Sequence, residues 1–457
     1  MNHARQATAS STATETPARS ITPEDDVIQP AQRLNANPFA TPYGSSPASR
    51  NASSTALHLI DQPRYFHSRR VKKGSVERPW MDRKDPKEKW VTIIPLVGIF
   101  VGLALSGVLI WDGLRSVVNH NYCEILNEDF SNGLNSKIWT KEVEVGGFGN
   151  GQFEMTTNTD ENAYVQDGML YIKPTLQDAA LIEKNNVINL QNSSCTSTVA
   201  ANCIAGTNVT NGTIVNPAKS ARLNTKLGAT IQFGRVEVTA QLPAGDWLWP
   251  AIWMLPRDSK YGDWPRSGEI DIMESRGNNW TYAQGGNNIV SSTLHWGPNA
   301  NNDAWWRNNV KRKALHTTYA SGFHTFGLEW SEKYIFTYID TRLLQVMYTH
   351  FNEPFWKYGQ FPLSDSNGTS LQDPWSYTGR DSTPFDQNFY LILNVAVGGT
   401  NGWFKDGASG KPWLDGSVTA PKDFWDARDQ WYPTWQKNGE MRVKSVKMWQ
   451  QQGYNGC

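Results

Sequence analysis

Three acidic residues stand close together in the segment GEIDIMES, residues 268–275. They are Glu269, Asp271 and Glu274. In a regular β-strand, residues two apart share a face and residues five apart do not, so the first two acids should point one way and Glu274 the other. A spacing that separates the third acid from the others needs a structural reason.

Three kinds of site use such a cluster: a charged strand edge, a hard-cation site, and a carboxyl pair for glycoside hydrolysis. The run lacks the glycine and the alternating Asp and Asn ligands of a calcium loop. The apolar Ile270, Ile272 and Met273 between the acids suit a core better than a solvated edge. A β-bulge at Ile272 and Met273 would return Glu274 to the face of the other acids. Two glutamates could then act as nucleophile and acid, while Asp271 raises the pKa of a neighbour.

Short strands must position these acids. From residue 123 onward, segments of alternating apolar and polar residues are separated by Gly, Asn, Asp and Pro, and we find neither an internal repeat nor an amphipathic helix of ordinary length. Residues 176–219 differ, being rich in Asn, Ser and Thr, and are expected to form a long surface loop. The pattern predicts an all-β antiparallel sandwich or barrel. Examples of the segments are MLYIKP, TIQFGRVEVTAQL, HTFGLEW, YIFTYID, FYLILNVAV and MRVKSVKMW.

The N-terminal region has a different composition. Ser, Thr, Ala, Pro and Asn dominate its first part, so we expect residues 1–90 to form a disordered tail. The uncharged run WVTIIPLVGIFVGLALSGVLIW is long enough to cross a hydrocarbon core of ~30 Å as a helix. We therefore expect a transmembrane signal anchor at residues 91–111, a linker at 112–122 and one large domain at 123–457.

The flanking charges predict the orientation of this anchor. Only Arg115 follows the run closely, which places the tail in the cytoplasm and the domain in the lumen or outside the cell, as in a single-pass type II membrane protein. The chain as a whole has 43 basic and 43 acidic residues, so its charge gives no sign of nucleic-acid binding. The basic residues before the run are Arg64, Arg69, Arg70, Lys72, Lys73, Arg78, Arg83, Lys84, Lys87 and Lys89.

All four cysteines follow the apolar run, in the compartment where disulfides persist. They allow three pairings, of which we favour Cys195 with Cys203 and Cys123 with Cys457. The sequon at Asn51, in the predicted cytoplasmic tail, shows that such triplets also arise by chance. Candidate glycosylation sites after the run are Asn192, Asn208, Asn211, Asn279 and Asn367.

The carboxylate motif resembles the catalytic signature of glycoside hydrolase family 16. It has the bulged form, E-x-D-x-x-E, of the laminarinase and β-1,3-glucan-binding-protein-like branch. The resemblance covers most of residues 123–452 and implies a β-jelly-roll sandwich of the concanavalin A-like type, with a glycan cleft across its concave sheet. Other segments that resemble the family, in its order, are GGFGNGQFEMTT, SARLNTK, FGRVEVTAQLPAGDWLWPAIWMLP, STLHWG, HTFGLEW and FYLILNVAVGG.

The resemblance also implies roles for individual residues. By motif position Glu269 is the nucleophile, Glu274 the acid/base and Asp271 their assistant, and His295 lies near the acid/base. The family needs no cofactor and allows a structural calcium ion on the sandwich. Some tryptophans of the alternating WPAIW segment must instead belong to the core. The substrate contacts that we expect are Asn150, Arg222, Trp249, Trp253, Trp264, His295 and Trp296.

These roles lead to the expected function, a retaining endo-β-glucanase. It would cleave β-1,3-linked or mixed β-1,3/1,4 glucan by double displacement through two glutamates. One alternative is a cell-wall transglycosylase in β-1,6-glucan assembly, similar to membrane-anchored fungal members of the family. Another is a β-glucan-binding protein without catalysis, because some relatives keep the fold and lose the glutamates. Both glutamates are present here.

Overall fold

The computed structural model describes residues 70–79, 82, 85–116, 119–365 and 367–457. Most of the predicted cytoplasmic tail, with Asn51, lies outside these residues, as do four of the basic residues used to predict orientation. The chain divides into two units, with the boundary at residues 99 and 100. The four basic residues outside the described part are Arg64, Arg69, Arg83 and Lys84.

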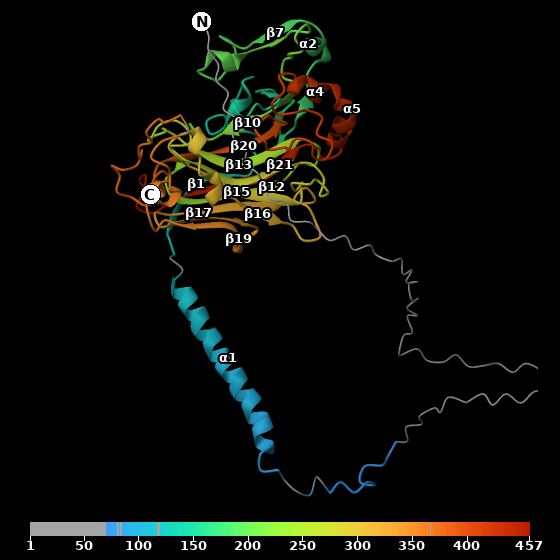
Figure 1. Ribbon diagram of the computed structural model, residues 1–457, viewed down its shortest axis with the longest axis vertical. Coiled ribbons are helices and arrows are strands. Elements are labelled where there is room, and N and C mark those ends of the chain that lie inside the picture. Colours follow the sequence, from blue (N-terminus) through green and yellow to red (C-terminus); the bar gives the residue numbers. More distant parts are fainter. Residues whose placement is uncertain (1–69, 80–81, 83–84, 117–118, 366) are drawn as a thin grey trace, which may run out of the picture. The chain divides into compact units, whose positions relative to one another are not determined.

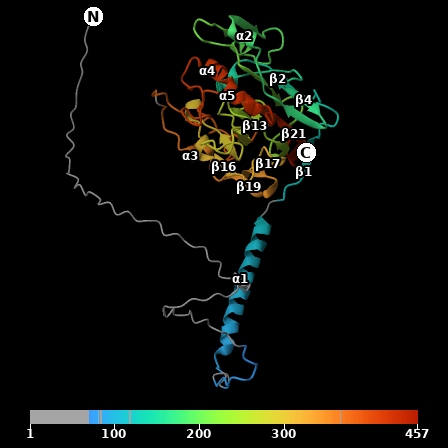
Figure 2. The ribbon, with the colours of Figure 1, turned by 90° about the vertical axis from the view of Figure 1, so that its right-hand side faces the viewer.

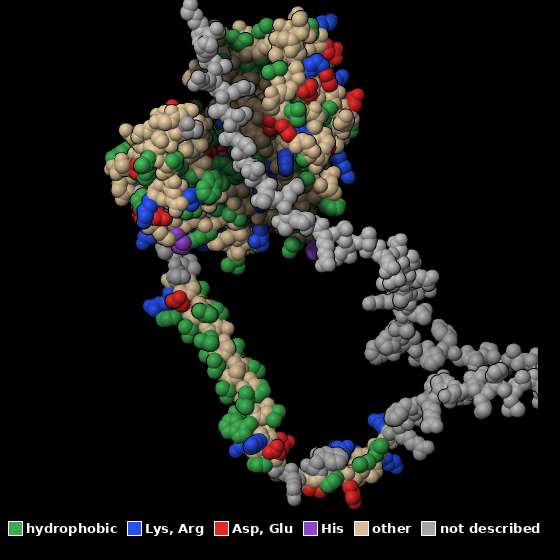
Figure 3. Space-filling model, in the orientation of Figure 1, with side chains coloured by type: hydrophobic (Ala, Val, Ile, Leu, Met, Phe, Trp, Pro, Cys, Tyr) green, Lys and Arg blue, Asp and Glu red, His purple; other side chains and the backbone are tan. Residues whose placement is uncertain are grey.

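The apolar run forms one long helix, α1 (Glu88–Ser116). The described residues contain this single candidate span, which has a mean hydropathy of 2.6. Its apolar side chains are exposed, and Figure 3 shows them along the helix with charged side chains at its ends. By length and composition, α1 is able to cross a membrane. The predicted span at residues 91–111 lies within it.

Two eight-stranded antiparallel sheets form the body of the second unit (Figures 1 and 2). The sheet that we call sheet 1 contains β19, β18, β17, β12, β21, β5 and β4 in this order, and β1 pairs with β21. Its strands are β1 (Tyr122–Glu128), β4 (Ala163–Gln166), β5 (Met169–Ile172), β12 (Gly234–Gln241), β17 (His324–Trp330), β18 (Tyr334–Ile339), β19 (Thr341–His350) and β21 (Met441–Gln451).

Sheet 2 contains the carboxylate motif, on β14. Its order is β16, β15, β14, β13, β20, β10 and β2, and β11 pairs with β20. Its strands are β2 (Thr140–Glu142), β10 (Arg222–Asn224), β11 (Thr230–Ile231), β13 (Leu248–Pro256), β14 (Glu269–Ser275), β15 (Ile289–His295), β16 (Val310–Lys313) and β20 (Phe389–Val397).

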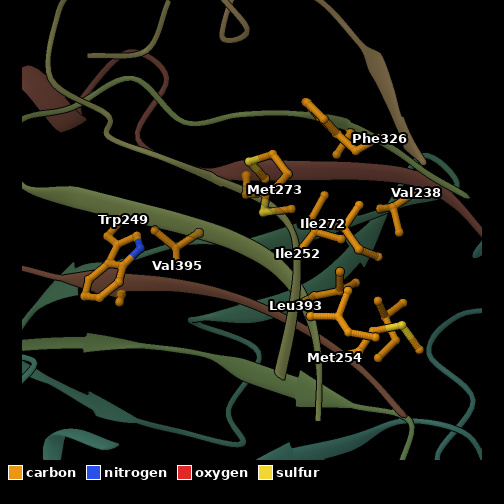
Figure 4. Close-up of a cluster of buried hydrophobic side chains, with 14 of the residues drawn as sticks. Val238, Trp249, Ile252, Met254, Ile272, Met273, Phe326, Leu393 and Val395 are labelled. Carbon is orange, nitrogen blue, oxygen red and sulfur yellow. The ribbon is translucent and has the colours of Figure 1, made fainter. Parts of the chain in front are cut away.

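The hydrophobic core lies between the two sheets. Along β12, buried residues alternate with partly exposed ones, because successive side chains of a strand point to opposite faces. Figure 4 shows Val238 and Phe326 of sheet 1 beside Ile252, Ile272 and Leu393 of sheet 2. Sandwich architecture, with apolar residues of both sheets turned inward, is therefore confirmed.

Short elements complete the second unit. Two small sheets join β3 (Glu154–Thr156), β9 (Ala218–Ser220) and β6 (Thr175–Leu176), and β7 (Asn186–Asn189) with β8 (Ile204–Thr207). Apart from α1, the described α-helices have four to seven residues. They are α2 (Ala179–Glu183), α3 (Phe355–Gly359), α4 (Ala420–Asp426) and α5 (Arg428–Trp431).

The segment 176–219, predicted as a long surface loop, has more structure than expected. It contains α2 and the β7–β8 pair, and it has a small core in which Ile182 and Val215 pack with Trp425 of α4. Polar composition hid this core, because only a few apolar residues form it. Figures 1 and 2 both show α2 near α4, away from β17 and β19.

Both predicted disulfides are present. Cys123, at the start of β1, is bonded to Cys457 at the end of the sequence, and Cys195 is bonded to Cys203. The first bond closes a loop of 334 residues, and such long closures remove much conformational freedom from the unfolded chain. It fixes the C-terminal end of the chain to the edge strand β1 of sheet 1.

Candidate active site

Strand β14 contains the predicted bulge. Asp271 pairs with Thr293 of β15 and Glu274 pairs with Ser291, so β14 advances three residues while β15 advances two. The register against β13 shifts at the same place. The extra residue returns Glu274 to the face of Glu269 and Asp271. Bulge and common face are therefore confirmed.

The opposite face of β14 is buried in the sandwich core. Ile270 and Met273 are fully buried, and Ile272 is nearly so. Figure 4 shows Ile272 and Met273 among the apolar side chains of both sheets. Apolar side chains on the core side thus hold the three carboxyl groups on the outer face of sheet 2.

A hydrogen-bonded chain through the core holds the bulge. The Ser292 hydroxyl donates to the carbonyl of Ile272 at 2.7 Å, and the Thr337 hydroxyl of sheet 1 donates to Ser292 at 2.8 Å. The backbone N–H of Met347 donates in turn to Thr337 at 3.2 Å. A bulge leaves backbone groups without ladder partners, and here a hydroxyl supplies the missing donor to Ile272.

Each of the two glutamates accepts one hydrogen bond from an indole. Nε1 of Trp264 donates to Glu269 at 2.7 Å, and Nε1 of Trp249 donates to Glu274 at 3.0 Å. Both carboxyl side chains are partly exposed, whereas Asp271 between them is only 2% exposed. One oxygen of each glutamate is therefore fixed by a rigid donor.

His295 lies between two aspartates. Its Nδ1 is 2.5 Å from Asp303, and its Nε2 is 3.2 Å from Asp271. Burial disfavours the charged imidazole, but the contacts with Asp271 and Asp303 outweigh burial and raise the pKa of His295 well above its ordinary value. We therefore treat the ring as an imidazolium that balances part of the negative charge of the site.

All three carboxyl groups of the motif hold their protons more tightly than usual. Burial and the charge of Asp271 raise the pKa of Glu269 to about 8. Burial and the charge of Glu274 raise the pKa of Asp271 to about 6. Burial also raises the pKa of Glu274. Because the groups interact, their protons belong to the set rather than to one residue, and near neutral pH the set has both acidic and ionised members.

One group of possible metal ligands occurs among the described residues, and it is this site. Ligand atoms of Glu269, Asp271 and His295 lie within 4.8 Å of one another. A histidine binds a metal through a neutral ring nitrogen, whereas both ring nitrogens of His295 face carboxylates. The geometry favours an ion-pair network over a metal centre.

Four of the predicted substrate residues lie on sheet 2 or in the loops beside it. Trp264 is 46% exposed, with its ring centre 5.6 Å from that of His295. Trp253 donates to Asn394 of β20 at 2.8 Å. Arg222 is buried, forms an ion pair with Glu142 at 2.7 Å, and lies against the ring of Trp253. Asn150 accepts a hydrogen bond from Asn401.

Two other predicted contacts are more buried than expected. Trp249 is 7% exposed and stacks on Trp403, so it orients Glu274 rather than offering an open ring. Trp296 is fully buried against Phe355 and Tyr358. A ring enclosed in this way has no face for a ligand, so the structure moves Trp296 from the predicted substrate contacts to the core.

Four residues of the site were not predicted. Ser292 donates to the bulge, and Asp303 contacts the His295 ring. Asn394 accepts a hydrogen bond from Trp253, and Trp403 stacks on Trp249. Alternation along β15 places Ser292 in the core. Because buried hydroxyl groups are nearly always hydrogen-bonded, a serine at a core position indicates a specific partner. Asp303 and Trp403 come from irregular segments, for which the sequence offers no comparable signal.

We predict that Ser292→Ala destabilises the fold, because it leaves the Ile272 carbonyl without a donor and the Thr337 hydroxyl without an acceptor. The free energy of unfolding should fall by about 1–3 kcal/mol, measured by urea denaturation of the full-length chain in detergent. The control Ser321→Ala removes an exposed hydroxyl and should change it by less than about 0.5 kcal/mol. Equal effects of the two variants would contradict the role given to Ser292.

Comparison with known proteins places the chain in a family. The model for glycosyl hydrolases family 16 matches residues 176–370. A β-1,3-glucan-binding protein of Penaeus monodon is 39% identical over 72% of this chain and 90% of that protein. A glucan endo-1,3-beta-glucosidase of Cryptopygus antarcticus is 32% identical over 60% of this chain and 79% of that one.

A longer relative shows the same similarity over part of its length. Glucan endo-1,3-beta-glucosidase A1 of Niallia circulans is 32% identical over 55% of this chain, and the match spans only 29% of that protein. The sandwich, the bulged carboxylate strand and the similarity to these proteins agree. The chain belongs to glycosyl hydrolases family 16.

Proposed function

We propose that this chain is a retaining endo-β-glucanase that acts on β-1,3-linked glucan. The observation that carries the proposal is the bulge in β14, which brings Glu269, Asp271 and Glu274 to one face. Separate indoles fix the two glutamates. Retaining hydrolysis needs two carboxyl groups on one substrate, one ionised and one protonated.

The proposed reaction has two displacements. The ionised Glu269 attacks the anomeric carbon while Glu274 gives its proton to the glycosidic oxygen, so the leaving chain departs with a hydroxyl group. A glycosyl ester on Glu269 remains. Glu274, now a carboxylate, takes a proton from water, and the resulting hydroxide oxygen attacks the same carbon and releases Glu269.

The neighbouring groups keep this pair in two protonation states. Asp271 adds negative charge between the glutamates, which favours retention of a proton in the set. The imidazolium of His295 limits this effect, because its charge lowers the pKa of each carboxyl group. The exposed ring of Trp264, beside Glu269, offers an apolar surface on which a pyranose ring can stack.

The names of similar proteins support glucan as the ligand. They are compatible with two functional classes, a glucan-cleaving enzyme and a glucan-binding protein without catalysis. The similar proteins of Cryptopygus antarcticus and Niallia circulans are named glucan endo-1,3-beta-glucosidases. The protein of Penaeus monodon, which is 39% identical, is named a β-1,3-glucan-binding protein. That name favours binding without catalysis as the second candidate. We prefer catalysis because this chain keeps both glutamates and their indole donors.

Transfer to another sugar is a variant of the same mechanism. If a sugar hydroxyl instead of water attacks the ester on Glu269, the product is a longer glucan and the chain is a transglycosylase. Products longer than the starting oligosaccharide would assign this variant. Activity on β-1,6-glucan alone would replace the β-1,3 linkage in the proposal.

We predict different azide products for the two glutamate variants. Glu269→Ala and Glu274→Ala should each lower kcat on laminarin by about 10³-fold or more. With a dinitrophenyl β-1,3-disaccharide and azide, the Glu269 variant should give the α-glycosyl azide and the Glu274 variant the β-glycosyl azide, resolved by NMR. The exposed control Glu183→Gln should keep the wild-type rate. Exchanged azide products would reverse the two roles.

The raised pKa values predict the pH profile. The carboxyl set keeps a proton up to about pH 8 and takes up further protons below about pH 6. We therefore expect kcat/KM on laminarin to fall above about pH 8, where the set loses the proton needed for the leaving group, and below about pH 6, where the set gains a further proton and loses an ionised carboxyl group.

The charge of His295 sets the position of this profile. His295→Gln removes a cation that lowers all three carboxyl pKa values, so both limbs should move to higher pH. A profile that stays in place, or moves to lower pH, would show that His295 is uncharged in the active enzyme.

We also propose a type II membrane topology. Helix α1 is able to span a membrane, the basic residues lie before its apolar run, and the two disulfides follow it. Disulfides persist in the secretory pathway and outside the cell, which agrees with a catalytic domain on that side.

Protease protection tests this topology. In sealed microsomes, added protease should remove the N-terminal tail and leave the disulfide-bonded domain intact, as seen with antibodies to each end. An N-glycosidase should lower the mass of the same domain if the sequons after α1 are used. Digestion of the domain in intact microsomes would show that the orientation is inverted.

A further inference from the structure

A large cavity lies on sheet 1, the sheet opposite the carboxylate strand. Its volume is about 1070 Å³, and its walls come from β17, β18, β19 and the loop at residues 380–382. In Figure 1, β17 and β19 lie in a different layer from β13 and β20. Volumes of this order are typical of small-ligand sites. The proposed catalytic residues take no part in this cavity.

Three aromatic side chains form one wall. Tyr334, Phe336 and Tyr348 lie nearly parallel, with ring centres 5.8–6.3 Å apart and interplanar angles of 15–25°. Phe336 pairs with Tyr348 across β18 and β19, on the strand face that points away from the core. Tyr348 is 44% exposed. The wall therefore presents an aromatic ring to solvent, a surface that suits stacking of a flat apolar sugar face.

The charges of the cavity balance. Three basic and three acidic side chains line it, and the pair of Arg342 with Glu329 is closed at 2.6 Å. Glu329 also accepts a hydrogen bond from Tyr334. A phosphate or another anion would meet as many carboxylates as cations, so the lining suits a neutral ligand with many hydroxyl groups. The charged residues are Lys333, Arg342, Arg380, Glu329, Glu332 and Asp381.

Two buried polar atoms of the lining lack partners. Oε1 of Gln451 and Nε2 of His120 have no hydrogen bond within the described part of the chain. Gln451 is nine-tenths buried. Both atoms are enclosed by protein atoms, so neither faces the open cavity. His120 lies two residues before β1 and contributes to the lining.

We propose that this cavity is a second β-glucan-binding site, separate from the proposed catalytic face. The ligand class rests on the proposed function, and the cavity itself supplies the stacked aromatic rings and a lining with balanced charges. Residues 345–350 of β19 run along it for about 17 Å, long enough for several sugar units. A polymer held there keeps further segments close to the catalytic face, which raises their effective concentration.

Tyr348 provides the test. In the full-length Glu269→Gln chain in detergent, calorimetric titration with laminarihexaose should show two sites. Tyr348→Ala should weaken one of them by about tenfold, whereas Tyr348→Phe, which keeps the ring, should leave both. The control Phe323→Ala removes another exposed ring, just before β17, that does not line the cavity, and it should also leave both sites. Thermal melting checks that each variant is folded.

Kinetics in the wild-type background give a second readout. Tyr348→Ala should raise KM for long laminarin severalfold and leave kcat/KM for laminaritriose unchanged, because a short substrate does not reach both faces. A single binding site unaffected by Tyr348→Ala, together with normal hydrolysis of laminaritriose, would overturn the second site and leave the proposed function intact.

Other results separate the two proposals. Binding that depends on Tyr348 without hydrolysis of any glucan would keep the second site and reject the enzyme. Displacement of bound hexaose from this site by inorganic phosphate at millimolar concentration would reject a neutral ligand in favour of an anion, and would overturn the proposal.

Discussion

The hydrogen bond from Ser292 to the carbonyl of Ile272 is the interaction on which the site depends. Without a bulge, Glu274 would face the core, where an unpaired carboxyl group is costly to bury. With it, three acids share one face while the apolar residues between them remain in the core. Since Thr337 belongs to sheet 1, the position of the carboxyl groups on sheet 2 is coupled to the packing of both sheets.

The electrostatic design follows from this placement. Three neighbouring carboxyl groups at a poorly solvated surface repel one another, and their pKa values rise. Compensation comes from the ion pairs of His295 with Asp271 and Asp303 and from the indole donors on the glutamates. Such a site lowers the stability of the folded chain as the pH rises, because the folded state binds protons that the unfolded chain releases. Functional sites often tolerate this cost.

Much of this arrangement could be predicted from the sequence, because it depends on local patterns. The alternation of apolar and polar residues predicted the strands, and the spacing of Glu274 predicted the bulge. Both predicted disulfide pairings are present. The burial of individual tryptophans was harder to predict. Trp264 is exposed and Trp296 is enclosed, yet either ring is compatible with core or ligand, and only the tertiary packing decides. Asp303 reaches His295 from an irregular segment, whose path no periodicity describes.

In the proposed mechanism, Glu269 and Glu274 act together on one substrate with retention of configuration. The most direct measurement is the anomeric configuration of the first product released from laminarin by the wild-type chain, followed by proton NMR before mutarotation. With retention, the β-anomer should appear first and the α-anomer only later. Initial release of the α-anomer, or no release while laminarin remains bound, would contradict it.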